Sequence, residues 1–371
     1  LAFHTFNFDP SISDSGVVAF GSVLSPNTPR HVGIWSGVPN ALTKIAVNGD
    51  PAPGTGSLFS EFIVNAYPYE RYWRVGINNA GDVLFAARFE DVLGDKAGWW
   101  LNYNSTPPAM APIVFEGMSL PTTLQPPFGG GTTSELVEGF SHAVLNQGRQ
   151  TAVVMSARVG PGQGTNVSAL FRGNPVTQTL HDRFVFGYDS LIYPPGIRAQ
   201  SYDSGPFLAD NNSVALTWSI GDASTSYPTD IVVSPSGQYT IMSGQSDSPI
   251  GYPSVQDNGY ALGSFSLSAP TPSTHDTGVY MRKPSPTGYY PNLWSALAGE
   301  GGFLLTSGNS CQPSSVVWGD FVSGNYVLMQ SQNKVRQAII VGNGREAGVD
   351  KDILYAVDMR DNCPCRRYVI I

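Results

Sequence analysis

The segment S-D-S-G-V-V-A-F, from Ser13 to Phe20, joins a turn to a short apolar strand, and similar segments occur five more times along the chain. The other copies are N-N-A-G-D-V-L-F from Asn78, L-N-Q-G-R-Q-T-A from Leu145, A-D-N-N-S-V-A-L from Ala209, Q-D-N-G-Y-A-L-G from Gln256 and F-V-S-G-N-Y-V-L from Phe321. We call the fourth residue of each copy its pivot: Gly16, Gly81, Gly148, Asn212, Gly259 and Gly324. Subtracting successive pivot numbers gives spacings of 65, 67, 64, 47 and 65 residues. Periodicity on this scale indicates a repeat architecture.

The pivots share a backbone requirement. Glycine adopts positive φ freely, and asparagine is among the next most tolerant residues, so we predict a structural turn at each pivot. The residue two positions before the pivot is Asp or Asn in five copies, and such side chains close turns by bonding to backbone two residues further on. After the pivot, alternate residues such as Val18 and Phe20 are apolar, which predicts a half-buried strand. The five Asp and Asn residues are Asp14, Asn79, Asn146, Asp210 and Asp257.

A second element follows several copies, in the form of an apolar stretch that runs into a Gly/Pro/Asp loop. Ile45–Val47 leads into N-G-D-P-A-P-G-T-G, and Ile339–Val341 leads into G-N-G-R. About four strands per repeat are typical of a propeller blade. We therefore predict an all-β fold, a six-bladed β-propeller of four-stranded antiparallel blades, in one domain over residues 1–371. A strand within residues 1–9 is expected to complete the last blade or to close the ring.

Composition argues against nucleic-acid binding, and the lengths of the apolar runs argue against a transmembrane segment. Charged residues make up 13% of the chain and the net charge is −8, without a basic stripe, so we expect no nucleic acid. The longest apolar runs have the length of strands, so no transmembrane segment is predicted. Ser, Thr, Asn, Gly and Tyr fill the place of charged residues, which suits a secreted or cell-surface protein.

The three cysteines, Cys311, Cys363 and Cys365, all lie in the last sixth of the chain. A disulfide from Cys311 to one of the other two would hold the C-terminus to its blade, whereas three reduced, buried thiols are the alternative. In an oxidised protein the third cysteine is free or links two chains. A zinc site would need a fourth ligand, so neither a metal nor a cofactor is expected.

The six copies, together with the loop G-D-P-A-P-G-T-G from Gly49 to Gly56, resemble the secreted bacterial tandem-repeat proteins with an N-x-x-G-x-x-x-F signature and a G-D-P-A-P-G-T loop. The likeness extends along most of the chain and is best in the first two repeats. It implies a propeller-like, exported protein. It implies no chemistry, because the group has no assigned reaction.

Two sets of residues could carry a function. His142, His181 and Arg198 could serve an extracellular polysaccharide lyase or glycoside hydrolase, although a histidine on a strand is more often structural. Aromatic residues could stack on sugars, although blade cores also use aromatics. We favour a binding or structural module whose partners are glycans or copies of itself, with the carbohydrate-active enzyme as the alternative. The aromatic residues are Tyr67, Tyr69, Tyr72, Trp73, Trp99 and Trp100.

Overall fold

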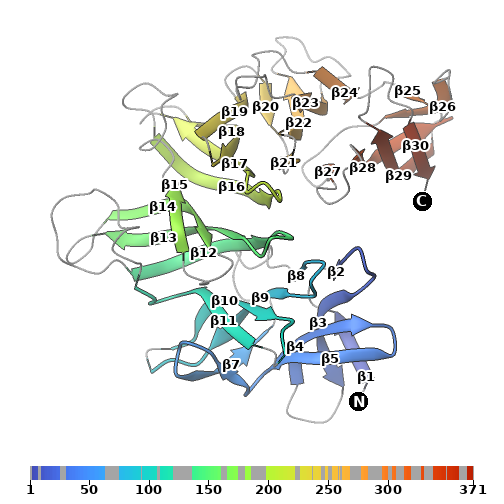
Figure 1. The fold of residues 1–371 in the computed structure, drawn as a ribbon. Coiled ribbons are helices and arrows are strands. Elements are labelled where there is room, and N and C mark those ends of the chain that lie inside the picture. The colour runs from blue at the N-terminus through green and yellow to red at the C-terminus, as the bar shows by residue number, and fades with distance from the viewer. Residues whose placement is uncertain are drawn as a thin grey trace. The chain divides into compact units, whose positions relative to one another are not determined.

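The computed structural model consists of strands and connecting turns, without helices in its described part. It describes residues 2–6, 10–25, 31–62, 75–92, 94–106, 109–119, 136–159, 165–173, 180–184, 198–221, 226–235, 237–243, 247–249, 253–257, 259, 261–267, 277–282, 295–299, 303–305, 313–318, 327–329, 337–347, 349–358 and 366–370. These residues form six successive antiparallel sheets in two compact units, Leu1–Val185 and Phe186–Ile371 (Figure 1). Each unit is described by itself, and the single domain over residues 1–371 stays a prediction.

The first unit holds three sheets. The first sheet has the order β1-β3-β4-β5 with β2 also on β3, and the second has the order β11-β10-β9-β7-β6 with β8 also on β9. The third sheet is β12-β13-β14-β15. The strands are β1 (Ala2–Phe6), β2 (Ser11–Ile12), β3 (Val18–Ser25), β4 (His31–Val38), β5 (Ala41–Val47), β6 (Pro51–Ala52), β7 (Ser57–Glu61), β8 (Gly76–Ile77), β9 (Val83–Phe89), β10 (Lys96–Tyr103), β11 (Ala109–Phe115), β12 (Leu136–Leu145), β13 (Thr151–Val159), β14 (Thr165–Gly173) and β15 (Leu180–Phe184).

The second unit also holds three sheets, in the orders β16-β17-β18-β19, β20-β22-β23-β24 and β25-β26-β28-β29-β30. Two short strands lie off these paths, β21 on β22 and β27 on β28. The strands are β16 (Arg198–Leu208), β17 (Val214–Gly221), β18 (Ser226–Ser234), β19 (Gly237–Ser243), β20 (Asp247–Pro249), β21 (Ser254–Val255), β22 (Ala261–Leu267), β23 (Thr277–Arg282), β24 (Ser295–Gly299), β25 (Phe303–Leu305), β26 (Pro313–Trp318), β27 (Val327–Met329), β28 (Gln337–Glu346), β29 (Val349–Asp358) and β30 (Arg366–Ile370).

All six sheets follow one plan, which confirms the predicted all-β fold built from propeller-type blades. The strand after each turn pairs with the strand before it and with the strand that follows. The four-stranded prediction holds for the third and fourth sheets, whereas the others contain five or six strands. The extra strands arise mainly because the strand before the turn is broken into two pieces that pair with the same neighbour, as β1 and β2 both do with β3.

The N-terminal strand belongs to the first sheet and not to the last blade, so the expectation for residues 1–9 is corrected. Phe6 of β1 pairs with Ser22 of β3, and Ile12 of β2 pairs with Val18 at the other end of β3. The two pieces together therefore supply the first strand of their own sheet. Pro10 lies between them and has no backbone N–H to donate to a neighbouring strand.

The sixth copy of the sequence pattern is also corrected. Val327–Met329, which the pattern places after a pivot, forms β27 and pairs with β28, as β2 pairs with β3. The long second strand of this sheet starts at Gln337, after β27. Its apolar run Ala338–Val341 pairs with β29 on one side, while β27 pairs with it on the other. The longer apolar strand β28, and not β27, is therefore the strand that lies between two neighbours in this sheet. Gly324 itself lies outside the described residues.

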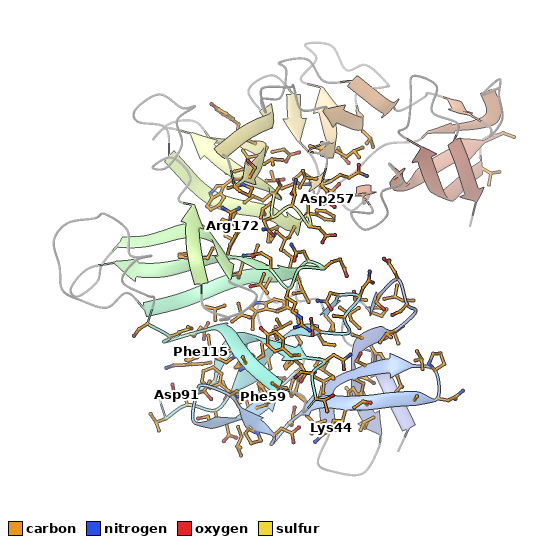
Figure 2. The ribbon with its side chains drawn as sticks, in the orientation of Figure 1. Lys44, Phe59, Asp91, Phe115, Arg172 and Asp257 are labelled. Carbon is orange, nitrogen blue, oxygen red and sulfur yellow. The ribbon has the colours of Figure 1, made fainter. Side chains whose placement is uncertain are left out.

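Aromatic side chains fill the core of the second sheet. Trp99 and Trp100 of β10 are both 0% exposed. The Trp100 ring packs edge-on against Phe59 at a centroid distance of 4.9 Å, and Phe85 lies 6.4 Å from it in a stacked arrangement. Figure 2 labels Phe59 and Phe115 in this sheet. The aromatic cluster buries a large apolar area and makes this sheet a major part of the first unit's core.

Candidate functional site

Five of the predicted turns lie among the described residues, and each one closes through a backbone hydrogen bond from its fourth residue to its first. Gly16 N–H, for example, donates to Ser13 O at 2.9 Å. Positive φ values confirm four pivots: Gly16 at 79°, Gly81 at 83°, Asn212 at 68° and Gly259 at 81°.

The third pivot is corrected from Gly148 to Arg149. Arg149 has φ of 64°, and its N–H donates to Asn146 O at 3.2 Å. Gly148 is not among the residues with positive φ. Arginine, which tolerates positive φ less well than glycine or asparagine, therefore occupies the position that these residues hold in the other four turns, at a steric cost of about 1–2 kcal/mol.

The first residue of a turn closes it with its side chain. Asn78 Oδ1 accepts from Asp82 N–H at 2.9 Å, and Asn146 Oδ1 accepts from Gln150 N–H at 2.8 Å. Ser13 Oγ makes the same bond to Val17 N–H at 3.2 Å. In the first two turns the closing role, which the pattern assigned to Asp14 and Asn79, falls to the residue before each of them, whereas Asn146 closes the third turn as predicted.

In three of the turns the second residue bonds to the second residue of the next turn along the chain. Asp14 N–H donates to Asn79 Oδ1 at 2.8 Å, and Asn79 N–H donates to Gln147 Oε1 at 2.6 Å. In the second unit, Asp210 N–H likewise donates to Asp257 Oδ1 at 2.7 Å. We call these contacts the inter-turn links. They join neighbouring sheets within each unit through side chains that the repeat places at equivalent positions.

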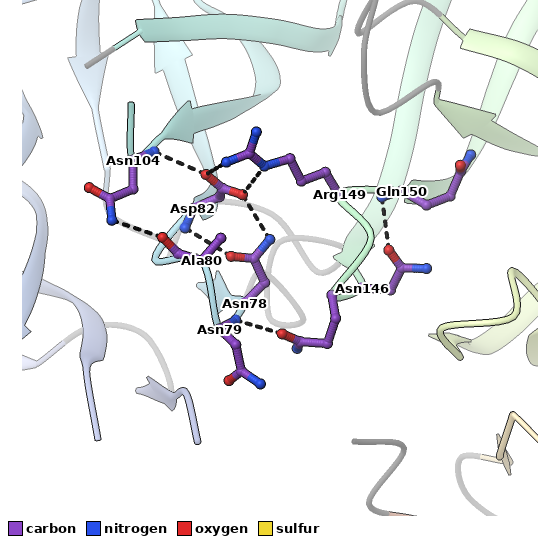
Figure 3. Close-up of polar contacts among 9 residues, drawn as sticks. Asn78, Asn79, Ala80, Asp82, Asn104, Asn146, Arg149 and Gln150 are labelled. Carbon is purple, nitrogen blue, oxygen red and sulfur yellow. Dashed lines mark hydrogen bonds and ion pairs between the residues drawn. The ribbon is translucent and has the colours of Figure 1, made fainter. Parts of the chain in front are cut away.

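One link is reinforced by an ion pair whose carboxylate is buried. Asp82 is 0% exposed and follows the turn of the second sheet, and Arg149 of the third turn donates to it twice, from Nε to Oδ2 at 2.7 Å and from Nη2 to Oδ1 at 3.2 Å (Figure 3). Asn78 Nδ2 donates to Oδ2 at 2.8 Å, and Asn104 N–H donates to Oδ1 at 3.0 Å. The Asp82 carboxylate thus accepts four hydrogen bonds.

Tyr103 lies beside this ion pair. The Arg149 guanidinium carbon is 5.6 Å from the centroid of the Tyr103 ring, within the range of a cation–π contact. Tyr103 is 6% exposed, and its hydroxyl is buried without a hydrogen-bond partner. Burial raises the pKa of Tyr103 to about 12; the Asp82 carboxylate adds to this rise and the Arg149 guanidinium opposes it. The phenol therefore stays protonated at neutral pH.

The cluster of Asn78, Asp82, Tyr103 and Arg149 has the composition of an acid–base site but the connectivity of a structural one. A general base must reach a substrate proton, whereas the Asp82 carboxylate is enclosed by four protein donors. No group of three or more metal-ligating side chains occurs in the part of the chain that the structure describes. What the arrangement does is to hold the second and third sheets together.

The G-D-P-A-P-G-T-G loop is also tied into the fold. Gly49, Gly54 and Gly56 all have positive φ, at 88°, 83° and 77°. Thr55 Oγ1 donates to Ala52 O at 2.8 Å, and Trp100 Nε1 donates to Pro53 O at 3.1 Å. The signature residues of the loop thus shape it and attach it to β10.

The predicted catalytic residues lie on three different strands, and their role stays a prediction. His142 lies on β12 and His181 on β15, and these strands are the two edges of the third sheet. Three interstrand spacings, about 14 Å, separate their backbones. Arg198 begins β16 in the second unit. The side chains of all three residues lie outside the described part.

The predicted sugar-binding aromatics divide into two groups. Trp99 and Trp100 are buried core residues, so the prediction that they stack on a ligand is wrong. Their rings pack against other apolar side chains of the core and are not exposed. Tyr67, Tyr69, Tyr72 and Trp73 lie outside the described residues, as do Cys311, Cys363 and Cys365. Sugar binding by Tyr67, Tyr69, Tyr72 and Trp73 stays a prediction, and so does the disulfide.

A second buried carboxylate was missed from the sequence. Asp230 on β18 is 1% exposed and accepts a 2.6 Å hydrogen bond from Thr217 Oγ1. The signal lies in the repeat register. The residue eight positions after the first residue of each turn has a cross-strand partner, and in the other four sheets with a described turn this partner is apolar. The register-equivalent pairs are Gly21–Ile34, Ala86–Trp99, Val154–Leu170, Thr217–Asp230 and Ser264–Val279.

Residues 3–182 match the model of a family described as "Family of unknown function (DUF7453)". This range lies within the first unit. No curated protein matches the chain. In the described residues, no helix is long and apolar enough to cross a bilayer.

Several solved structures are similar to the chain at low identity. The β-propeller domain of the Trilobed protease from Pyrococcus furiosus is 8% identical, with a TM-score of 0.47, over 100% of this chain and 94% of that one. The Hadza microbial sialidase Hz136 is 8% identical, with a TM-score of 0.39, over 91% of this chain and 66% of that one. The Dos1 propeller is 11% identical, with a TM-score of 0.37, over 99% and 84%. At these scores the likeness supports no particular function.

Proposed function

We propose that this chain is a non-catalytic binding or structural module that acts outside the cell, at the surface or in secreted form, and associates with glycans or with further copies of itself. The observation that carries the proposal is the saturation of Asp82 by four protein hydrogen bonds. In this cluster the polar residues serve to join two sheets. The low charged content, 13%, is in keeping with an extracellular surface.

The surface supplies contact area without strong charge. The hairpin of β4 and β5 exposes Val38 at 41% and Leu42 at 37%, and β5 is an edge strand of its sheet. An edge strand presents unpaired backbone groups that a second chain can use. These features support association with copies of the chain, while the aromatic residue types within the sequence 67–73 support glycan binding.

Three measurements on the purified chain test the proposal. Light scattering after size-exclusion chromatography, over a range of concentrations, reports self-association, and a glycan array reports sugar binding. Trp73→Ala is the variant that should lose a glycan signal, with Trp99→Phe in the buried core as the matched control. A monomer that binds no glycan would contradict the proposal, and so would cleavage of any polysaccharide in a product-release assay.

A further inference from the structure

Two irregularities in strand pairing meet at β7, close to the segment in which the chain passes from the first sheet to the second. Gly49 N–H donates to Phe59 O at 2.8 Å, and Phe59 N–H donates to Asp50 O at 2.9 Å, so Gly49 and Asp50 both face Phe59. With φ of 88° at Gly49, this is a β-bulge of the type that begins with a left-handed glycine. On the other side of β7 the register also shifts, between Phe59 and Glu61, which leaves Ser60 as the extra residue.

Two polar atoms at these bulges are buried and have no hydrogen-bond partner: Asn48 Oδ1 and Ser60 Oγ. The first bulge sets Gly49 and Asp50 against Phe59, so the residues next in line, Asn48 and Ser60, oppose each other. The backbone of Asn48 is held in place, because its N–H donates to Val32 O of β4 at 3.0 Å. A buried polar atom left without a partner costs about 1–3 kcal/mol, and nearly all such atoms in folded proteins bond to protein or to ordered water.

The chemistry of the two atoms is complementary to one particular ligand. Asn48 Oδ1 only accepts a hydrogen bond, whereas the Ser60 hydroxyl can donate as well as accept. The two atoms are not bonded to each other. We propose that one buried water molecule binds between them, donates to Asn48 Oδ1, accepts from the Ser60 hydroxyl, and so joins the end of β5 to β7. A divalent cation does not fit, because Ca²⁺ and Mg²⁺ require about six or more oxygen ligands.

The water has a structural consequence that the direct contacts do not supply. Ordering one water costs no more free energy than leaving the two polar atoms unpaired. Between Val47 and Pro51 the chain crosses from one sheet to the next. The water links this crossing segment to β7 through the side chains of Asn48 and Ser60. The first bulge sets the backbones of Asn48 and Ser60 opposite each other in register.

A crystal structure at a resolution that orders solvent tests the proposal directly. The expected result is a solvent peak within about 3.2 Å of both Asn48 Oδ1 and Ser60 Oγ. In crystals of Ser60→Ala the peak should be lost, while β7 keeps its register. A wild-type structure without the peak, or with the two side chains bonded directly, would overturn the proposal.

Denaturation of four chains provides the solution test: the wild type, Ser60→Ala, Asn48→Leu and the double variant. If the water bridges the two residues, Ser60→Ala lowers the unfolding midpoint in the wild type and changes it much less in the Asn48→Leu background. Ser57→Ala in the same strand is the matched control and should show no such dependence on residue 48. Additive shifts for Ser60→Ala and Asn48→Leu would refute the bridge.

Discussion

Asp82 and Arg149 are 67 residues apart in sequence, and two hydrogen bonds, of 2.7 and 3.2 Å, join their side chains. The carboxylate is fully buried, whereas the side chain of Arg149 is 40% exposed. The pair therefore closes the boundary between the second and third sheets with a charge that water cannot reach. It also explains why an arginine, and not a glycine, occupies a left-handed position in the third turn.

The backbone cost at Arg149 can be separated from the loss of its ion pair. Arg149→Ala and Arg149→Gly both remove the two bonds to Asp82, but only glycine relieves the positive φ. We expect both variants to be less stable than the wild type, and the glycine variant to be more stable than the alanine variant by about 1 kcal/mol. Urea denaturation measures the difference. Equal stabilities would show that the turn does not require a left-handed residue at position 149.

The corrected pivot makes a second comparison possible. Gly148→Ala should change the free energy of unfolding by less than about 0.5 kcal/mol, because an added β-carbon there would lie 3.4 Å from Asn146 Oδ1 and φ is not positive. Gly81→Ala should cost about 2 kcal/mol, because φ is +83° and the β-carbon would lie 2.7 Å from Asn104 Nδ2. If Gly148→Ala were the more destabilising of the two, Gly148 and not Arg149 would be the left-handed residue of the third turn.

Tyr103 predicts a dependence of stability on alkaline pH. Its pKa in the folded chain is about 12, above the ordinary value of 10.0. Between these values the unfolded chain releases the proton while the folded chain retains it, so the free energy of unfolding falls as pH rises. The contribution of Tyr103 to that free energy is complete below pH 10 and is lost as pH rises towards 12. Denaturation of the wild type and Tyr103→Phe from pH 7 to 11 isolates this residue, and the variant should lose less stability above pH 10.

At neutral pH the same Tyr103→Phe variant should be as stable as the wild type or more stable by about 1 kcal/mol. The substitution removes a buried hydroxyl that has no partner and keeps the ring under Arg149. A clear loss of stability at pH 7 would mean that the hydroxyl makes a contact after all.

The buried carboxylate of the second unit should depend on its threonine. Thr217→Val keeps the shape of the side chain but removes the 2.6 Å bond to Asp230, and we expect a cost of about 2 kcal/mol. Thr217→Ser retains the donor and is the matched control for the loss of the hydrogen bond. Thermal unfolding of the two variants decides the point. A valine variant as stable as the serine variant would show that the bond does not stabilise Asp230.

Part of the candidate site follows from residue types, and part does not. The turns at Gly16, Gly81, Asn212 and Gly259 were predictable, since their left-handed backbone follows from the residues themselves. The turn at Arg149 was not, because its backbone preference points to the neighbouring glycine and the bonds to Asp82 decide otherwise. In the same way, an Asp or Asn before an apolar strand predicts a turn. The neighbouring residues do not predict that Asn79 Oδ1 accepts a hydrogen bond from the N–H of Asp14, 65 residues earlier.

By itself the sequence determined an all-β chain of repeated antiparallel sheets, because φ preferences and the alternation of apolar side chains act over a few residues. Only the tertiary structure decided which side chains join the sheets, that Trp99 and Trp100 are core residues, and that the N-terminal strand pairs with β3. Those outcomes depend on contacts between segments far apart in the chain. Burial and hydrogen-bond geometry settle such contacts after the strands have formed.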